Sequence, residues 1–411
     1  MNTTNETRKL YDDDAYATEF DAVILSCAPA APKNGRPVYE LLLDQTLFFP
    51  EEGGQSPDLG VLTIISGSTV LSLEVIDVQI KNNQIYHSVA LSGISSSSDL
   101  LTEGVAVHGK IDWEHRFSNM QQHSGEHIFS GIVHSKYGFE NVGFHLSDQT
   151  VTMDYNGILT PAQVAELELL VNRAIVENVE IVTGYPSKEA LAALNYRSKK
   201  EIEGRLRIVT VTGYDVCACC APHVHRTGEI GMLKVMHIQN YKGGVRLTIL
   251  CGFRALAAFS EKQATLSELT RMLSTSEDAI ADSVEKMRTT IQQLKYDLSR
   301  TQREHLFEKA ASISSEEKNV LFFEPALEQG AARELLNDLV KKHSGFCGIF
   351  IGEDATGYSF LVASEGCDCA ALAASMRTAL NAKGGGTPRM IQGHTAASKT
   401  SVIEFFRTQT V

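Results

Sequence analysis

The sequence predicts an α+β protein that begins with a small β-barrel and continues through an α+β domain, a helical hairpin or coiled coil, and an α/β domain. Three observations support this prediction. Short β-branched runs dominate the first hundred residues, the hydrophobic period then changes to that of helices, and residues 253–324 contain neither glycine nor proline. Because 411 residues exceed one ordinary hydrophobic core, several domains are expected. The expected domains are residues 1–105, 106–254, 255–312 and 313–411.

The barrel is predicted from short apolar runs that glycine, proline, asparagine and serine separate. Several short strands at this spacing are typical of a small barrel or sandwich. The runs are FDAVILSC, VYELLLD, VLTIIS, TVLSLEVIDVQI and QIYHSVAL.

The second domain mixes helices with strands. The run FSNMQQHSGEHIFSGIVHSKYG predicts one helix that ends at Gly138, and PAQVAELELLVNRAIVENV predicts a second helix that opens on a proline. The remaining runs alternate as strands do: TVTMDY, RLRIVTVTGYD, MLKVMHIQ and GGVRLTILCG.

The last two domains differ in their period. From Leu266 to Leu298, apolar residues recur at threes and fours, which is the spacing of a coiled-coil seam. The polar STSED at 274–278 resembles an N-cap, so we expect two helices and not one rod. The end of the chain predicts strands in NVLFFEPAL, FCGIFIGE and YSFLVAS, a helix in CAALAASMRTALNA, a loop at KGGG and a last strand in SVIEFF.

The net charge of −13 argues against a protein that coats nucleic acid without specificity. It leaves room for a specific RNA substrate, because phosphate contacts need only a local basic patch. Residues 195–209 and 376–411 are two such patches. No apolar stretch approaches the roughly 20 residues that span a bilayer, and the polar start has neither signal nor transit pattern. A cytoplasmic protein without membrane contact is expected.

Two clusters of metal-binding side chains stand out. His123 and His127 share one face of the predicted helix, one turn apart. Residues 215–228, DVCACCAPHVHRTG, hold three thiols and two imidazoles, with Cys219 and His223 again four apart. Nitrogen and sulfur ligands in a tetrahedron suit zinc. The clusters together predict a zinc site with four protein ligands, or with three and an open position.

Several motifs resemble one family. RFSNMQQHSGEH is similar to the histidine helix of the alanyl-tRNA synthetase editing domain, and CCAPHVHRTGEIG to that domain's cysteine–histidine motif. DQTLFFPEEGGQSPDLG resembles its glycine-rich loop, and KGGGTPRMIQG resembles a loop of the C-terminal DHHA1 domain. The matches run in order from about residue 44 to residue 393. The chain thus resembles the long-form AlaX family of free-standing alanyl-tRNA editing proteins.

The resemblance implies a zinc-containing editing domain whose Zn²⁺ ligands are His123, His127, Cys219 and His223. It also implies hydrolysis of mischarged tRNA-Ala, chiefly Ser-tRNA-Ala with Gly-tRNA-Ala as a second substrate, and a DHHA1-like domain for tRNA binding or dimerisation. This sequence departs from the family pattern at three places. Ser124 replaces a threonine, Cys220-Ala221-Pro222 replaces Gly-Gly-Thr, and Glu52 replaces the first glycine of the glycine-rich loop. Cys217 or Cys220 could therefore compete for the metal.

Three residues are candidates for the chemistry. Thr46 aligns with the substrate loop and is the candidate contact for a serine hydroxyl, since a site built for that hydroxyl disfavours alanine. Gln55 comes from the same loop, and Glu126 stands beside His127. The candidate nucleic-acid contacts are Arg116, Gln122, Arg197, Lys199, Lys200, Lys242, Arg246, Lys383, Gly384, Gly385, Gly386 and Arg389.

Two alternatives stay open. HSGEH also spells the inverted zinc-peptidase motif, with Glu126 as base. A non-catalytic tRNA-binding protein with a structural zinc is the other, and a closed four-ligand site would favour it. A homodimer could form through the helical hairpin or the C-terminal domain.

Overall fold

The computed structural model describes residues 6–33, 35–91, 100–198 and 205–409. Within them the chain divides into two compact units, Met1–Thr265 and Leu266–Val411. Both units combine helices with sheets, which confirms the α+β class. The finer division into four domains stays a prediction. In the described residues, no helix is long and apolar enough to cross a membrane.

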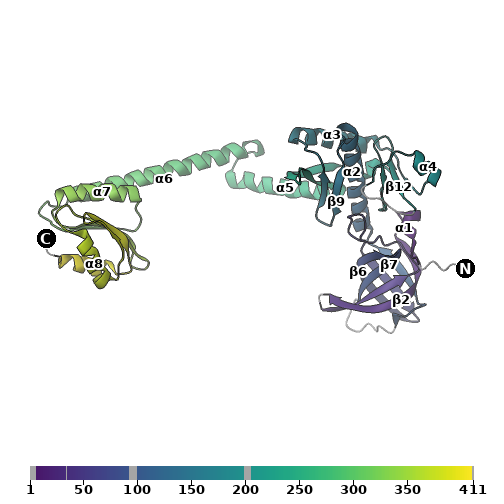
Figure 1. The fold of residues 1–411 in the computed structure, drawn as a ribbon, viewed down its shortest axis with the longest axis horizontal. Coiled ribbons are helices and arrows are strands. Elements are labelled where there is room, and N and C mark those ends of the chain that lie inside the picture. The colour runs from purple at the N-terminus through teal and green to yellow at the C-terminus, as the bar shows by residue number, and fades with distance from the viewer. Residues whose placement is uncertain (1–5, 34, 92–99, 199–204, 410–411) are drawn as a thin grey trace. The chain divides into compact units, whose positions relative to one another are not determined.

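The first unit opens with a closed barrel, in which the strands are joined in the order β2-β3-β7-β6-β5-β8 (Figure 1). Side chains alternate along these strands, as Leu71, Leu73 and Val75 do on β6, so that one set of apolar residues fills the interior. The barrel strands are β2 (Glu19–Lys33), β3 (Arg36–Leu43), β5 (Gly60–Ser66), β6 (Thr69–Lys81), β7 (Gln84–Leu91) and β8 (Ala106–Ile111). Three short elements accompany them: β1 (Arg8–Lys9), α1 (Leu10–Asp13) and β4 (Gln45–Thr46).

Two antiparallel sheets make up the rest of this unit. One has the strand order β14-β15-β10-β9 and the other β11-β12-β13. Helices α2 (Trp113–Tyr137) and α3 (Pro161–Glu177) pack together and against the four-stranded sheet. The strands are β9 (Asn141–Leu146), β10 (Val151–Tyr155), β11 (Ile181–Gly184), β12 (Ile208–Val211), β13 (Asp215–Ala218), β14 (Leu233–Tyr241) and β15 (Gly244–Cys251). The short helices are α4 (Lys188–Ala193) and η2 (Thr227–Ile230).

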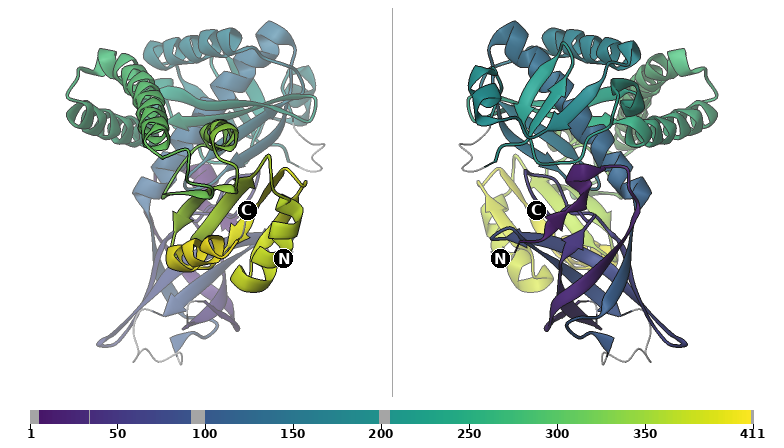
Figure 2. Two further views of the ribbon diagram at one scale, coloured as in Figure 1. Left: turned by 90° about the vertical axis from the view of Figure 1, so that its left-hand side faces the viewer. Right: turned by 90° about the vertical axis from the view of Figure 1, so that its right-hand side faces the viewer.

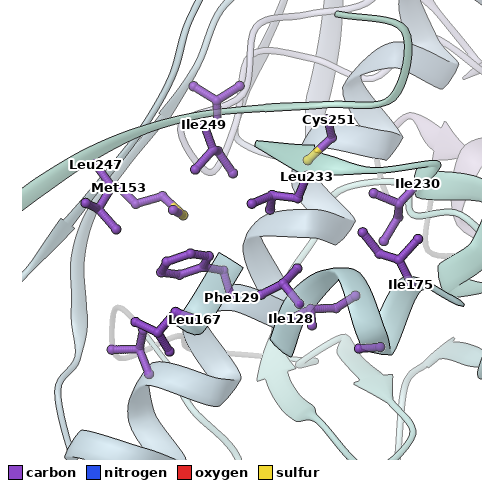
Figure 3. Close-up of a cluster of buried hydrophobic side chains, with 14 of the residues drawn as sticks. Ile128, Phe129, Met153, Leu167, Ile175, Ile230, Leu233, Leu247, Ile249 and Cys251 are labelled. Atoms are coloured by element: carbon purple, nitrogen blue, oxygen red, sulfur yellow. The ribbon is translucent and has the colours of Figure 1, made fainter. Parts of the chain in front are cut away.

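The core between α2, α3 and the four-stranded sheet is apolar. Figure 3 shows Phe129 of α2 and Leu167 of α3 facing Met153 and Leu247 of the sheet. The helix α2 begins at an Asp112 cap, whose carboxylate accepts from the His115 N–H at 3.1 Å, and ends at Gly138 with φ 68°. Its end is the one that the sequence predicts.

Helix α2 is unusual because the side chains that it buries are mostly polar. Fifteen of its 25 residues are buried, and nine of those fifteen carry polar or charged side chains. Buried polar groups destabilise a fold unless they are paired. A helix of this composition therefore indicates a functional site along its length.

The second unit is a five-stranded sheet with the order β16-β17-β18-β20-β19, covered by helices on both faces (Figure 2). Residues Leu306, Leu335 and Ile349 belong to the cluster on one face, whereas Phe350, Leu372 and Phe406 belong to the cluster on the other. The strands are β16 (Val320–Glu324), β17 (Cys347–Glu353), β18 (Gly357–Ala363), β19 (Lys383–Gly386) and β20 (Met390–Thr395). The helices are α6 (Ile280–Ala311), α7 (Gln329–Lys342), α8 (Cys369–Leu380) and α9 (Lys399–Arg407).

Two predictions at the C-terminus are wrong. The run SVIEFF is part of helix α9, because the Ser398 hydroxyl caps the Ser401 N–H and Val402 and Phe406, one turn apart, are both buried. The KGGG run is the edge strand β19 and not a loop. A Cβ at Gly384 would lie 2.2 Å from the Gln392 carbonyl oxygen, so only glycine lets β19 approach β20 this closely.

The break predicted at STSED is confirmed. Helix α5 (Gly252–Leu273) ends before it, and α6 begins after the 3₁₀ turn η3 (Glu277–Ala279). The apolar seam is not buried, since Val284, Met287 and Leu294 keep 50%, 51% and 62% of their surface exposed.

A buried ion pair joins the loop after β4 to α2. Arg116 and Asp58 are both fully buried, and the Arg116 Nε donates to the two Asp58 carboxylate oxygens at 3.1 and 2.9 Å. Arg116 also donates to the carbonyl oxygens of Ala15 and Leu47, while Asp58 accepts from the Phe49 N–H at 2.6 Å. The pair is therefore fully hydrogen-bonded and cannot be reached from solvent.

Replacing one member of this pair should destabilise the first unit strongly. The variant Arg116→Met leaves the Asp58 carboxylate buried and unpaired, which typically costs about 3–5 kcal/mol of the free energy of unfolding. Urea unfolding followed by the fluorescence of Trp113, the only tryptophan, measures this loss. The control is Arg36→Met, which removes an exposed pair with Glu74 and should cost less than about 1 kcal/mol. Equal losses in the two variants would contradict the prediction.

Candidate metal centre

Four residues converge in the first unit: His123 and His127 from α2, and Cys219 and His223 from the loop after β13. One ligand atom of each lies within 4.8 Å of the others. The Cys219 Sγ lies 3.5 Å from the His123 Nε2 and 3.4 Å from the His223 Nε2. The structure thus brings together the four residues that the sequence selected, although His123 and Cys219 are 96 residues apart in the chain.

The loop that carries Cys219 and His223 is held from two sides. Arg207 donates to the carbonyl oxygens of Cys219 and Ala221 at 3.2 and 2.7 Å, and its own carbonyl accepts the Cys219 N–H at 3.1 Å. On the other side, the Val224 N–H donates to the Ser124 hydroxyl of α2 at 3.3 Å. The loop is therefore fixed against the histidine helix before any ion binds.

Each of the three imidazoles is oriented by a partner at its Nδ1. The Nδ1 of His123 lies 2.7 Å from the Gln55 Oε1, and that of His127 lies 3.0 Å from the Asp215 Oδ2. The Nδ1 of His223 lies 2.9 Å from the Ser124 Oγ. All three rings can therefore present Nε2 to a common point, and partners of this kind typically orient metal-binding histidines.

Asp215 is a carboxylate that Arg197 holds in place. The Arg197 Nε and Nη2 donate to the two Asp215 oxygens at 2.7 and 2.9 Å. Burial alone would raise the pKa of Asp215, but its bonds to His127 and Arg197 keep that pKa below the ordinary value. Asp215 in turn raises the pKa of His127 to about 9 against the effect of burial. A metal ion at His127 must therefore displace a proton.

The three neighbouring thiols differ in their electrostatics. Burial would raise the pKa of Cys219, but the adjacent His123 and His223 outweigh burial and lower it well below the ordinary value. Burial raises the pKa of Cys217 to about 12, and burial with the negative charges of Cys219 and Glu52 raises that of Cys220. Because metals bind the thiolate, Cys219 is the thiol suited to a ligand role.

A second group, His127, Asp215 and Cys217, also lies close enough together to hold an ion. The Arg197 guanidinium already neutralises Asp215, and the Cys217 thiol stays protonated. A cation would have to compete with Arg197 there. The donor set of three imidazoles and one thiolate fits zinc better.

The loop between β4 and β5, called the barrel loop below, reaches the candidate metal centre through a tight glycine turn. The Gln55 N–H donates to the Glu52 carbonyl at 3.1 Å across Gly53 and Gly54, which have φ values of 63° and 86°. A Cβ at Gly54 would lie 2.3 Å from the Phe144 carbonyl oxygen of β9, so the turn needs glycine at this position. The turn is fixed to β9, and this fixes the buried Gln55 against His123.

Thr46 lies inside the fold with a partner that the sequence did not indicate. Its hydroxyl lies 2.8 Å from the His87 Nε2 and accepts the Phe48 N–H at 3.0 Å. Burial lowers the pKa of His87 to about 4, so this imidazole is neutral, with its Nδ1 3.3 Å from the Leu41 carbonyl. The Thr46 hydroxyl keeps one lone pair beyond these two contacts.

Glu126 belongs to a buried polar network behind His127. Its Oε1 accepts from the Ser130 hydroxyl and the Asn141 amide, both at 2.6 Å, and the Ser130 Oγ lies 2.8 Å from the Tyr155 hydroxyl. The Glu126 Oε2 lies 3.9 Å from the His127 Nε2. The carboxylate is thus held next to the metal centre.

The predicted nucleic-acid contacts fall into four classes. Arg116 and Gln122 are fully buried, and Gln122 exchanges two hydrogen bonds with the Cys251 backbone, so the prediction that they contact tRNA is corrected. Arg197 is committed to Asp215. Lys199 and Lys200 lie outside the described residues.

The remaining predicted contacts are on the surface. Lys242 is exposed in the turn between β14 and β15, and Arg246 pairs with Asp154 beside the Tyr241 ring. In the second unit, Lys383, Gly384, Gly385, Gly386 and Arg389 are all exposed.

Comparison with known proteins agrees with this arrangement. The family described as tRNA synthetases class II (A) matches residues 3–115, and the threonyl and alanyl tRNA synthetase second additional domain matches residues 206–248. The chain is 26% identical over 406 residues to the alanyl-tRNA editing protein AlaX-L of Pyrococcus horikoshii, with 96% of each chain covered. It is 30% identical over 294 residues to the alanyl-tRNA editing protein Aarsd1 of Danio rerio, covering 68% of this chain and 67% of that protein.

A synthetase is similar as well. The chain is 30% identical over 292 residues to the alanine–tRNA ligase of Pyrococcus furiosus, but the match spans only 30% of the ligase. The similarity to the two editing proteins covers a far larger share of their length.

The zinc content of cysteine variants should show which of the three thiols is a zinc ligand. We expect about one zinc per chain in the protein and in the variants Cys217→Ser and Cys220→Ser, because their protonated thiols are not ligands. Cys219→Ser should lose most of its zinc after dialysis against a chelator. Elemental analysis by mass spectrometry measures the content. Zinc loss in Cys217→Ser with retention in Cys219→Ser would refute the ligand assignment.

Proposed function

Because the chain belongs to the alanyl-tRNA editing protein family, we propose that it is a zinc-dependent hydrolase that deacylates mischarged tRNA-Ala. Its main substrate is Ser-tRNA-Ala, with Gly-tRNA-Ala as a second, and it acts in the cytoplasm. The observation that carries the proposal is the convergence of His123, His127, Cys219 and His223, with Gln55 bonded to the first of them.

Hydrolysis of an aminoacyl ester asks little of a nucleophile, since the ester is already an activated acyl group. Water adds to the acyl carbon, the acyl–oxygen bond to the ribose breaks, and the ribose oxygen takes the remaining proton. The protein has to position the ester and stabilise the charge that grows on its carbonyl oxygen. A zinc ion held by His123, His127, Cys219 and His223 supplies positive charge and a fixed geometry.

If all four side chains held a zinc ion, no coordination position would be left for the ester, so the residues around the centre would have to position it. Gln55 lies against His123 and is the residue best placed to contact the ester. Glu126 has the role of orienting α2 and His127, since its Oε1 is already bonded to Ser130 and Asn141.

Thr46 is our candidate for recognising the serine side chain. Its hydroxyl donates to the neutral His87 and accepts from Phe48, which leaves one lone pair for the hydroxyl of a seryl group. An alanyl group would leave that lone pair unpaired. Sites built to bond a hydroxyl discriminate strongly against analogues that lack it.

The exposed cations are our candidates for tRNA contact. Lys242 lies on the first unit, whereas on the second Lys383 begins β19 and Arg389 directly precedes β20. We propose that the second unit is a DHHA1-like domain that binds tRNA. The exposed apolar seam of α6 would then serve a homodimer.

The two alternatives are weaker. An inverted zinc peptidase takes a distant glutamate as third ligand, whereas Cys219 and His223 fill the remaining positions here. The non-catalytic tRNA-binding protein agrees with a closed four-ligand site. It does not account for the glycine turn that brings Gln55 into the centre.

Deacylation assays test the proposal directly. Purified protein should deacylate Ser-tRNA-Ala fastest and Gly-tRNA-Ala more slowly, and should leave Ala-tRNA-Ala largely intact. The variant His123→Ala should lower kcat/KM by about 100-fold or more, because a lost ligand costs at least as much as a lost partner of a ligand. His134→Ala, on the exposed part of the same helix, is the control.

Three results would contradict the proposal. If the protein deacylated neither Ser-tRNA-Ala nor Gly-tRNA-Ala, it would not be the proposed hydrolase. Binding of tRNA without deacylation would favour the non-catalytic alternative, and digestion of casein would favour the peptidase.

The variant Thr46→Val should weaken the preference for serine. We expect kcat/KM for Ser-tRNA-Ala to fall by about 10- to 100-fold, as for a lost hydrogen bond in a buried site, with that for Ala-tRNA-Ala unchanged. Thr63→Val is the control, since Thr63 lies on β5 between the core residues Leu62 and Ile64. An unchanged ratio of the two substrates in Thr46→Val would exclude Thr46 as the selecting residue.

A further inference from the structure

The Gln55 side chain holds an unused hydrogen-bond donor next to the metal centre. With a metal ion at its Nε2, His123 would carry its hydrogen at Nδ1 and donate it to the Gln55 Oε1, which lies 2.7 Å away. The amide nitrogen, Nε2, therefore points elsewhere. It has no partner within the described part of the chain, although Gln55 is fully buried. Buried donors are rarely left unpaired, so this one indicates a missing acceptor.

An unused acceptor lies beside it on the same turn. Glu52 and Gln55 form an antiparallel bridge across Gly53 and Gly54. Residues paired in this way point to the same face, with Cβ atoms about 4.5–5.5 Å apart. The Glu52 Oε2 is buried and has no hydrogen-bond partner among the described residues.

Glu52 also faces the ligand loop. A Cβ at the neighbouring Gly53 would lie 3.5 Å from the Cys220 Sγ. Cys220 directly follows the ligand Cys219. The donor of Gln55 and the acceptor of Glu52 therefore both lie at the metal centre, one against His123 and the other against the Cys219 loop.

An α-amino ester carries the complementary pair of groups. Its carbonyl oxygen accepts, and its α-ammonium, one carbon away, donates and is positively charged. We infer that Glu52 and Gln55 form a subsite for the aminoacyl backbone, in which Glu52 binds the α-ammonium and the Gln55 amide donates to the ester carbonyl oxygen. This inference rests on the proposed function and specifies its substrate class as esters of free α-amino acids.

Glu52 makes the subsite a feature of this chain. The editing-domain pattern that the loop resembles has a glycine at this position, which offers no charge to an ammonium group. The subsite also explains why the glycine turn is tight. A two-residue turn with both φ values positive sets Glu52 and Gln55 directly opposite each other.

The test compares Ser-tRNA-Ala with its α-hydroxy analogue, the glyceroyl (2,3-dihydroxypropanoyl) ester, in which a hydroxyl replaces the ammonium at nearly the same size. Each rate is divided by the rate without enzyme, because the two esters differ in intrinsic lability. A charge-assisted hydrogen bond predicts that kcat/KM for the seryl ester exceeds that for the glyceroyl ester by about 10- to 100-fold. Glu52→Gln should remove this preference by slowing only the seryl ester.

The control is Glu51→Gln, which changes the neighbouring exposed carboxylate that accepts from Gln79 at 2.9 Å. It should keep the preference. Equal normalised rates for the two esters in the unchanged protein would overturn the inference, and so would identical behaviour of Glu52→Gln and Glu51→Gln.

The Gln55 half is tested by Gln55→Glu, which keeps an acceptor for His123 but removes the donor. Both esters should then be hydrolysed about 100- to 1,000-fold more slowly, as for a lost donor to a developing oxyanion, with zinc content unchanged. Loss of zinc together with activity would overturn the donor role and leave Gln55 as a positioning residue only.

A binding measurement separates this inference from the proposed function. Calorimetry measures the affinities of the 3′-serylamido and 3′-glyceroylamido analogues of adenosine, whose amide bond replaces the ester. We expect tighter binding of the seryl compound by about 10- to 100-fold, lost in Glu52→Gln. Equal affinities would overturn the subsite even if the protein deacylates tRNA, and the expected ratio would support the subsite even if it does not.

Discussion

The site depends on one buried ion pair, between Arg116 of α2 and Asp58 of the loop that leaves the barrel. Arg116 precedes His123 by two helical turns on the same face of α2, and Asp58 follows Gln55 by three residues. The pair thus fixes two rigid elements together a short distance from the point where Gln55 meets His123. Because both charges are removed from water and fully hydrogen-bonded, the loop has little freedom to slide along the helix.

The polar face of α2 follows from the same constraint. A helix that buries Gln122, His123, Glu126 and His127 can be stable only if each side chain finds a partner with the right geometry. Those partners come from the barrel loop, from β9, from β13 and from β15. The elements of the first unit are therefore joined through polar contacts at the site itself, in addition to the apolar core on the other side of α2.

The electrostatics of the cysteine-rich loop distinguish one thiol from two similar groups. Cys217, Cys219 and Cys220 are chemically identical and almost adjacent. Cys219 lies against the imidazoles, which lower its pKa, whereas burial raises the pKa of Cys217 and Cys220 more than the nearby cations Arg197 and Lys9 lower it. Replacing glycine by Cys220 in this chain is compatible with a metal centre for this reason.

By itself, the sequence determined the local features: the helix that ends at Gly138, the one-turn spacing of His123 and His127, and the four-residue step from Cys219 to His223. These depend on helical period, caps and ligand spacing, which neighbouring residues specify. The predictions for SVIEFF as a strand and KGGG as a loop were wrong, because a short apolar or glycine run takes its conformation from the sheet that it packs on.

Tertiary structure alone decided what surrounds the ligands. Gln55, Asp215 and Ser124 reach the three imidazoles across 68, 88 and 99 residues of chain, and no local pattern specifies such contacts. It also placed Arg116 in a buried ion pair with Asp58 and not on the surface, since the sequence does not reveal which carboxylate lies next to an arginine in the fold. The same holds for Glu52, whose position opposite Gln55 exists only once the glycine turn is closed.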